Sequence, residues 1–113
     1  MALKAHVGFA IPDADDIGRK AAAHFERFGY QLIEQGPTEW VFQRGKKSAV
    51  LWRFDVRAYF TTLTVRAVRQ KNGELWVSCD WEVFTLMSIV TAGDVQTLEA
   101  EGRELETVLR TMD

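Results

Sequence analysis

The chain is poor in the residues through which small proteins are held together by metals or disulfides. Its 113 residues include one cysteine, Cys79, and two histidines, His6 and His24. A single cysteine excludes an intrachain disulfide and favours a reducing compartment. Zinc sites normally use three or four protein ligands, and the spacing of these three residues does not predict one. We therefore expect a protein without a metal or other cofactor.

Long apolar runs are also missing. The most apolar stretch, Val83–Val90, has eight residues and contains Thr85 and Ser88, whereas a transmembrane helix needs about 20. The apolar run Val7–Ile11 is too short for the core of a signal peptide. We expect a soluble cytoplasmic protein that makes no contact with membranes.

No motif in the sequence predicts an enzyme. The segment Asp13–Gly18 has acids and a glycine at positions of a calcium loop, but Ile17 and His24 occupy positions that require oxygen ligands. No glycine-rich phosphate loop or nucleophile-elbow serine is present. Asp80 and Glu82 lie two residues apart on one predicted strand, where ordinary cross-strand pairing explains them. We therefore expect a non-enzymatic protein.

What the chain does contain is typical of one globular domain. The sequence is 47% hydrophobic and 27% charged. A chain of this length buries roughly 65% of its unfolded surface, which is enough for one core. We expect a single domain over residues 1–113.

A first amphipathic helix is predicted over Asp13–Phe28. Its acidic start, with Asp15 and Asp16 following Asp13, is suited to capping free amides, and Gly29 is suited to ending the helix in the left-handed conformation. Its apolar face, at three- and four-residue spacing, consists of Ala14, Ile17, Ala21, Phe25 and Phe28.

A second helix is predicted over Asp94–Met112, after a capping arrangement at Thr91. Gly102 lies on its apolar seam, where a better helix former is normally preferred by about 1 kcal/mol. A close approach of the backbone to the sheet or to a partner helix would explain this glycine. The seam consists of Val95, Leu98, Gly102, Leu105, Leu109 and Met112.

The segment between the helices has the alternation of β-strands. Tyr30–Gln35 and Trp40–Arg44 are joined by a turn at Pro37, which predicts a hairpin. Two further alternating segments follow at 61–69 and 75–83, after a first one that contains Val50, Trp52, Phe54 and Val56.

The apolar pattern also predicts the register of the last hairpin. A two-residue turn at Asn72–Gly73 would set Leu63 against Glu82 and place a charge in the core. A three-residue loop, Lys71–Gly73, matches apolar residues instead, with Gly73 left-handed. The predicted inward pairs are Leu63–Trp81, Val65–Cys79 and Ala67–Val77. Helix, four or five antiparallel strands and helix together predict a two-layer α+β sandwich with both helices on one face.

Basic residues are concentrated in one stretch of the chain. Between Arg44 and Lys71 there are eight basic residues and one acid, whereas the remaining six basic residues accompany fifteen acids. The predicted strands place Arg53, Arg57 and Arg66 on the outer face of the sheet, together with Trp76. Such a face suits an acidic protein surface or a second copy of the chain.

Two other interpretations of the basic stretch remain open. Nucleic acid would bind the same arginines and stack on Trp76 and Tyr59, although the pI of about 5.7 is low for such a protein. Alternatively, the face is solvated: Asp80 offsets part of the charge of Arg66, and the final helix supplies the balancing acids Glu99, Glu101, Glu104 and Glu106.

A second candidate surface is the apolar connector that follows the last strand. Its large side chains cannot all fit one inward row, so some would form an exposed patch for a second copy or another protein. The candidate patch consists of Phe84, Leu86, Met87 and Ile89. A small-molecule carrier is a third hypothesis, with a pocket lined by Trp40, Trp52, Phe54 and Trp81. The first expectation is a protein–protein interaction module that forms a homodimer.

Overall fold

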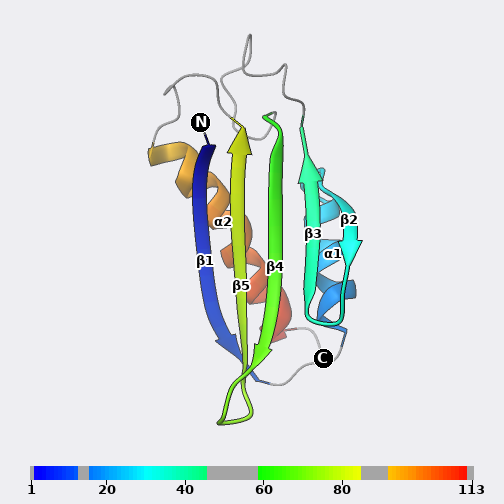
Figure 1. The fold of residues 1–113 in the computed structure, drawn as a ribbon. Coiled ribbons are helices and arrows are strands. Elements are labelled where there is room, and N and C mark those ends of the chain that lie inside the picture. The colour runs from blue at the N-terminus through cyan, green and yellow to red at the C-terminus, as the bar shows by residue number, and fades with distance from the viewer. Residues whose placement is uncertain (1, 13–15, 46–58, 85–91, 112–113) are drawn as a thin grey trace.

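The chain folds into a five-stranded antiparallel sheet with two helices on one face, as predicted (Figure 1). The computed structural model describes residues 2–12, 16–45, 59–84 and 92–111. The elements are β1 (Ala2–Ile11), α1 (Ile17–Glu26), β2 (Gln31–Gln35), β3 (Glu39–Arg44), β4 (Thr61–Arg69), β5 (Leu75–Phe84) and α2 (Ala92–Thr111). In the sheet the strands lie in the order β1-β5-β4-β3-β2. The alternating segment predicted over 50–56 lies outside the described residues.

The described chain starts with a strand rather than with the predicted helix. β1 pairs with β5 along its whole length, from Ala2 opposite Phe84 to Ile11 opposite Leu75. Its buried residues Ala5, Val7, Phe9 and Ile11 alternate with Lys4, His6, Gly8 and Ala10. The same alternation is present in the sequence, but the run is short, and its pairing partner is some seventy residues away.

The β4–β5 hairpin has the predicted register. Leu63 lies opposite Trp81, Val65 opposite Cys79 and Ala67 opposite Val77. The Gln70 amide donates to the Glu74 carbonyl (2.7 Å), and Gly73 has a φ of 87°. The apolar match between the two strands was therefore sufficient to select the three-residue loop.

α1 begins later than predicted and has a different N-terminus. Asp16, the residue before the helix, is left-handed with a φ of 60°, and its carboxylate makes no capping bond. It pairs instead with Arg19 (3.3 Å), so the predicted capping by Asp16 is wrong, while Asp13 and Asp15 lie outside the described residues. A left-handed N-cap directs the side chain away from the helix amides, which explains the missing bond.

The end of α1 is as predicted. Gly29 has a φ of 91°, and the Tyr30 amide donates to the Phe25 carbonyl (3.1 Å). This six-to-one bond is that of a Schellman motif, which needs a residue without a Cβ penalty at the left-handed position.

α2 crosses the sheet closely, as Gly102 predicted. A Cβ built on Gly102 would lie 2.6 Å from Cη2 of Trp81 and 3.1 Å from Cβ of Val7. Glycine therefore lets the helix backbone approach β1 and β5. Thr91 and Met112 lie outside the described residues, and none of the described helices is long and apolar enough to cross a membrane.

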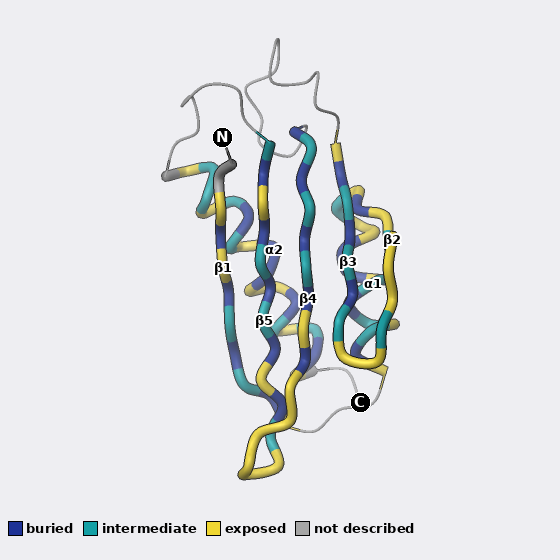
Figure 2. Tube along the Cα trace, in the orientation of Figure 1, coloured by how far each residue is buried: buried dark blue, intermediate teal, exposed yellow. Residues whose placement is uncertain are grey.

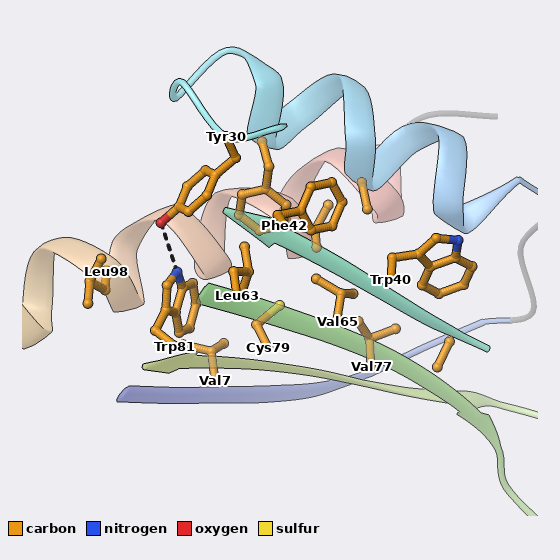
Figure 3. Packing of buried hydrophobic residues seen from close by; sticks show 14 of the residues in the cluster. Val7, Tyr30, Trp40, Phe42, Leu63, Val65, Val77, Cys79, Trp81 and Leu98 are labelled. Atoms are coloured by element: carbon orange, nitrogen blue, oxygen red, sulfur yellow. Dashed lines mark hydrogen bonds between the residues drawn. The ribbon is translucent and has the colours of Figure 1, made fainter. Parts of the chain in front are cut away.

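The core lies between the sheet and the two helices. Buried and exposed residues alternate along the long strands (Figure 2). Trp40 and Trp81 are both buried and pack among aliphatic residues of the core (Figure 3). Their placement fills the space in which the carrier hypothesis required a pocket, and Trp52 and Phe54 lie outside the described residues.

Candidate protein-interaction face

The helices cover one side of the sheet and leave the other side open. The open side is formed by every second residue of the strands, which we call the open face. Its described members on the four adjacent strands are Lys4, His6, Gly8, Ala10, Glu39, Val41, Gln43, Thr62, Thr64, Arg66, Val68, Trp76, Ser78, Asp80 and Glu82. Such a face is normally polar in antiparallel sheets, so large apolar side chains on it are informative.

One end of the open face is apolar. Trp76 is 39% exposed and lies directly opposite Val68, which is 57% exposed. On the other side, Trp76 lies opposite Ala10 of β1. A Cβ built on Gly8 would lie 2.5 Å from Cζ2 of Trp76, so the indole lies over the glycine backbone. We call Gly8, Ala10, Val68 and Trp76 the Trp76 platform.

Charged pairs occupy the rest of the open face. Arg66 on β4 donates from Nε to Oε2 of Glu39 on β3 (2.8 Å). This hydrogen bond and the charge of Glu39 raise the pKa of Arg66 above its usual value, and the charge of Asp80 contributes less. The predicted offset of Arg66 by Asp80 is therefore minor, because Glu39 is the direct partner.

Asp80 has a different partner. Its Oδ1 lies 2.6 Å from Nδ1 of His6 on the neighbouring strand β1. A shallow groove of about 640 Å³ follows these residues, with Lys4, Thr64 and Glu82 also along it. The described members of the open face include two bases, Lys4 and Arg66, and three acids, so this part of the face is not basic.

The predicted site residues are only partly tested by the structure. Arg66 and Trp76 do lie on one face, two strand positions apart, while Arg53 and Arg57 are outside the described residues. A basic face suited to an acidic partner or to nucleic acid thus depends on residues whose positions are not described. Tyr59 is buried, so the predicted stacking of bases on Tyr59 is wrong.

The apolar connector is mostly outside the described residues. Leu86, Met87 and Ile89 are among residues 85–91, and only Phe84 is described. Phe84 is half-buried at the end of β5, where its amide donates to the Phe60 carbonyl (2.9 Å). The predicted patch therefore remains a prediction.

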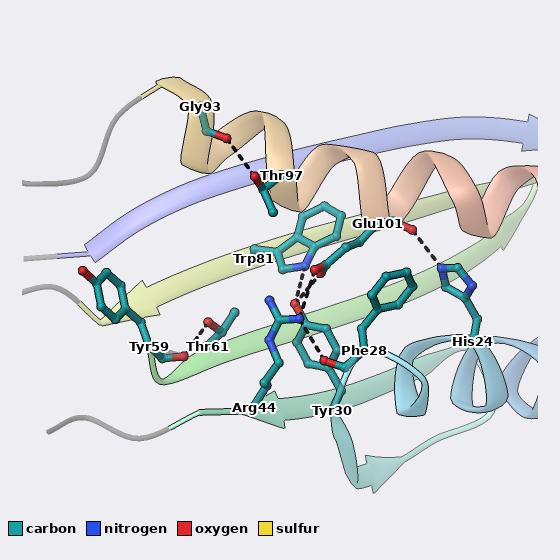
Figure 4. Close-up of polar contacts among 10 residues, drawn as sticks. All are labelled: His24, Phe28, Tyr30, Arg44, Tyr59, Thr61, Trp81, Gly93, Thr97 and Glu101. Atoms are coloured by element: carbon teal, nitrogen blue, oxygen red, sulfur yellow. Dashed lines mark hydrogen bonds and ion pairs between the residues drawn. The ribbon is translucent and has the colours of Figure 1, made fainter. Parts of the chain in front are cut away.

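The opposite side of the sheet holds a buried polar network (Figure 4). Arg44 Nη1 donates to Oε2 of Glu101 (3.0 Å), and the Tyr30 hydroxyl donates to Oε1 (2.9 Å). Trp81 Nε1 donates to the Tyr30 oxygen (3.1 Å). His24 Nε2 lies 2.9 Å from the Glu101 carbonyl. The network joins β3, β5, α2 and the segment after α1.

Sequence reasoning missed this network and treated Arg44 and Glu101 as solvated charges. Their side chains are only 5% and 3% exposed. A signal was present for both: Arg44 continues the inward row of Trp40 and Phe42, and Glu101 falls between Leu98 and Leu105 on the apolar seam. Charged residues are rarely buried without a partner, and neither sequence position identifies the partner.

The network is saturated around Glu101 but not around Arg44. Nε and Nη2 of Arg44 are buried without a hydrogen-bond partner among the described residues. The guanidinium carbon lies 4.1 Å from the centroid of the Tyr30 ring, a cation–π contact that compensates in part. Burial raises the pKa of Tyr30, which the nearby charge of Arg44 opposes. Tyr30 therefore stays protonated and structural.

The described residues supply no reactive centre. No three His, Cys, Asp or Glu side chains of this part of the chain gather to hold a metal ion. Cys79 is fully buried, and burial raises the pKa of its thiol to about 12. A thiol in this environment is not a nucleophile near neutral pH.

Neither the protein-family models nor the curated proteins with which the sequence was compared give a match. The evidence for a function is therefore the geometry of the open face.

Proposed function

We propose that this chain is a non-enzymatic interaction module that receives a partner protein on its open face, with the Trp76 platform as the anchor. The observation that supports this most directly is the position of Trp76. It is a large, partly exposed side chain beside Val68, on a face that no described helix covers. Tryptophan is enriched among residues that dominate the energy of protein interfaces.

The surroundings of the platform suit a protein partner. Arg66 and Glu39 already neutralise each other, as do His6 and Asp80 when the imidazole is protonated. A partner that covers the apolar end would leave these pairs at the polar rim, as in typical interfaces. Gly8 and Ala10 add no bulk beside the indole, so one flat side of the platform stays accessible.

The experiment is site-specific photo-cross-linking in the native host. A photoreactive phenylalanine analogue at position 76 should give discrete covalent adducts with protein. The same residue at position 104, which is exposed on α2, is the matched control. Adducts at both positions in equal yield, or at neither, would remove the proposal. Trp76→Ala should leave the melting temperature nearly unchanged, which separates lost binding from lost folding.

A further inference from the structure

The backbone hydrogen bonds of the sheet show which groups of β1 are free. Gln70 donates to Glu74 and Phe84 donates to Phe60. Because bonded pairs alternate along an antiparallel ladder, the even-numbered residues of β5 bond to β4. The odd-numbered residues of β5 must then bond to β1.

It follows that the even-numbered residues of β1 direct their N–H and C=O groups away from the sheet. One contact agrees directly: Arg110 of α2 donates from Nη2 to the Ala10 carbonyl (2.6 Å) at this edge. For Lys4, His6 and Gly8, no described residue bonds to the backbone groups on this side. Unpaired groups of this kind are a template for another strand.

The other edge of the sheet, β2, is different. β2 has five residues, and its pairing with β3 shifts register between Leu32 and Glu34. Shortness and bulges are two of the devices that protect edge strands from pairing. β1 has ten residues and no shift in register. Only β1 is therefore prepared to accept a strand.

We propose that β1 pairs antiparallel with β1 of a second copy, around a two-fold axis at His6, so that the two sheets become one. In this register His6 lies opposite its equivalent, and Lys4 lies opposite Gly8 of the second copy. The lysine, which protects an edge against like charge, meets a residue without a side chain. On the covered face, Ala5 lies opposite Val7 of the second copy, which continues the apolar row.

A neighbouring register is less favourable. With the axis at Val7, Lys4 would lie opposite Ala10 of the second copy. The Ala10 carbonyl already accepts the bond from Arg110, which would have to be broken. The axis at His6 pairs three residues of each copy without disturbing this contact.

The position of α2 favours a second copy over an isolated peptide. In Figure 1 the first turns of α2 extend past the β1 edge, behind the sheet. In the two-fold pair, each α2 would thus lie behind the β1 strand of the other copy, with the two helices antiparallel. An added peptide strand would leave this overhang without a partner.

The dimer leaves the open face free, so it does not depend on the partner proposed for the Trp76 platform. Sedimentation equilibrium should show a dimer of the wild-type chain. Lys4→Pro removes an edge N–H without touching the β1–β5 ladder and should weaken association by about tenfold or more. Gln35→Pro, the matched change at the outward edge of β2, should have no effect. A monomeric wild type, or a Lys4→Pro dimer as tight as the wild type, would overturn the proposal.

Disulfide trapping tests the register itself. In a bonded antiparallel pair the Cα atoms are about 5.5 Å apart, within the range that a disulfide spans. His6→Cys should therefore form a covalent dimer under a mild thiol oxidant, whereas Ser78→Cys, on the same face one strand away, should not. The native Cys79 is buried and should not interfere. Equal cross-linking of both variants, or of neither, would contradict an axis at His6.

Discussion

Two arginine–glutamate pairs lie on opposite sides of this sheet and differ mainly in burial. Arg44 and Glu101 lie on the helix side, with an N–O distance of 3.0 Å and side chains 5% and 3% exposed. Arg66 and Glu39 lie on the open face, with a distance of 2.8 Å and side chains 55% and 46% exposed. Nearly equal distances thus occur in very different solvent environments.

The comparison teaches that distance alone does not set the contribution of an ion pair. A buried charge has lost its water and depends on its partner, so removal of one member leaves an uncompensated charge. An exposed charge returns to water at little cost when its partner is removed. The buried pair should therefore be essential to the fold, and the exposed pair should be nearly dispensable.

The largest effect is expected from Glu101→Gln. The change leaves the Arg44 guanidinium buried without a counter-charge, and it should destabilise the fold by about 3–5 kcal/mol in urea unfolding. A loss below about 1 kcal/mol would show that the buried pair is no more important than a surface pair.

The double variant Arg44→Met with Glu101→Leu is the control for this prediction. It removes both charges and keeps apolar volume, so stability should recover to near the wild-type value. Failure to recover would mean that the contact of Arg44 with Tyr30, rather than the charge balance, carries the stability.

A smaller effect is expected from Tyr30→Phe. The hydroxyl donates to Glu101 and accepts from Trp81 Nε1, so its removal leaves a buried indole N–H without an acceptor. The expected loss is about 1–3 kcal/mol, measured by urea unfolding at neutral pH. A neutral outcome would indicate that a water molecule replaces the hydroxyl.

The same residue predicts how stability depends on alkaline pH. Burial raises the pKa of Tyr30 in the folded state, so the folded chain keeps this proton longer than the unfolded chain. Stability is then complete below the unfolded pKa of about 10 and falls as the pH rises above it. Cys79, with a pKa raised to about 12, acts in the same direction from a lower starting pH.

Urea midpoints at about pH 8 and about pH 10.5 test this dependence. The wild type should lose stability between them, and Tyr30→Phe should lose less because one of the two linked protons is absent. An equal loss in both proteins would assign the alkaline effect to Cys79 or to other groups.

The sequence predicted local pairing well because the relevant forces are local. The loop at Gly73 and the register of Leu63 with Trp81 follow from an apolar alternation that one slip would reverse. Gly102 was interpretable because a glycine on an apolar seam needs a steric reason, and Trp81 supplies it. These features depend on patterns within a few residues.

The rest could not be predicted because it depends on contacts between distant residues. β1 is stabilised by β5, and the sequence alone does not show that Val7 will lie beside Cys79. Arg44 and Glu101 are 57 positions apart, so their burial could be suspected from the periodicity but not their pairing. The open face was expected to be basic, and its described part carries more acids than bases because Glu39 was assigned to a turn.

The smallest effect is expected from Glu39→Gln on the open face. Arg66 stays solvated when its partner is neutralised, so the urea midpoint should not change measurably at an ionic strength of about 0.15 M, where exposed charges are screened. Comparison with Glu101→Gln isolates burial, because the same chemical change is made in two arginine–glutamate pairs of similar length. A loss from Glu39→Gln as large as that from Glu101→Gln would mean that the open face is covered in solution, and this result would place the Arg66–Glu39 pair inside an interface.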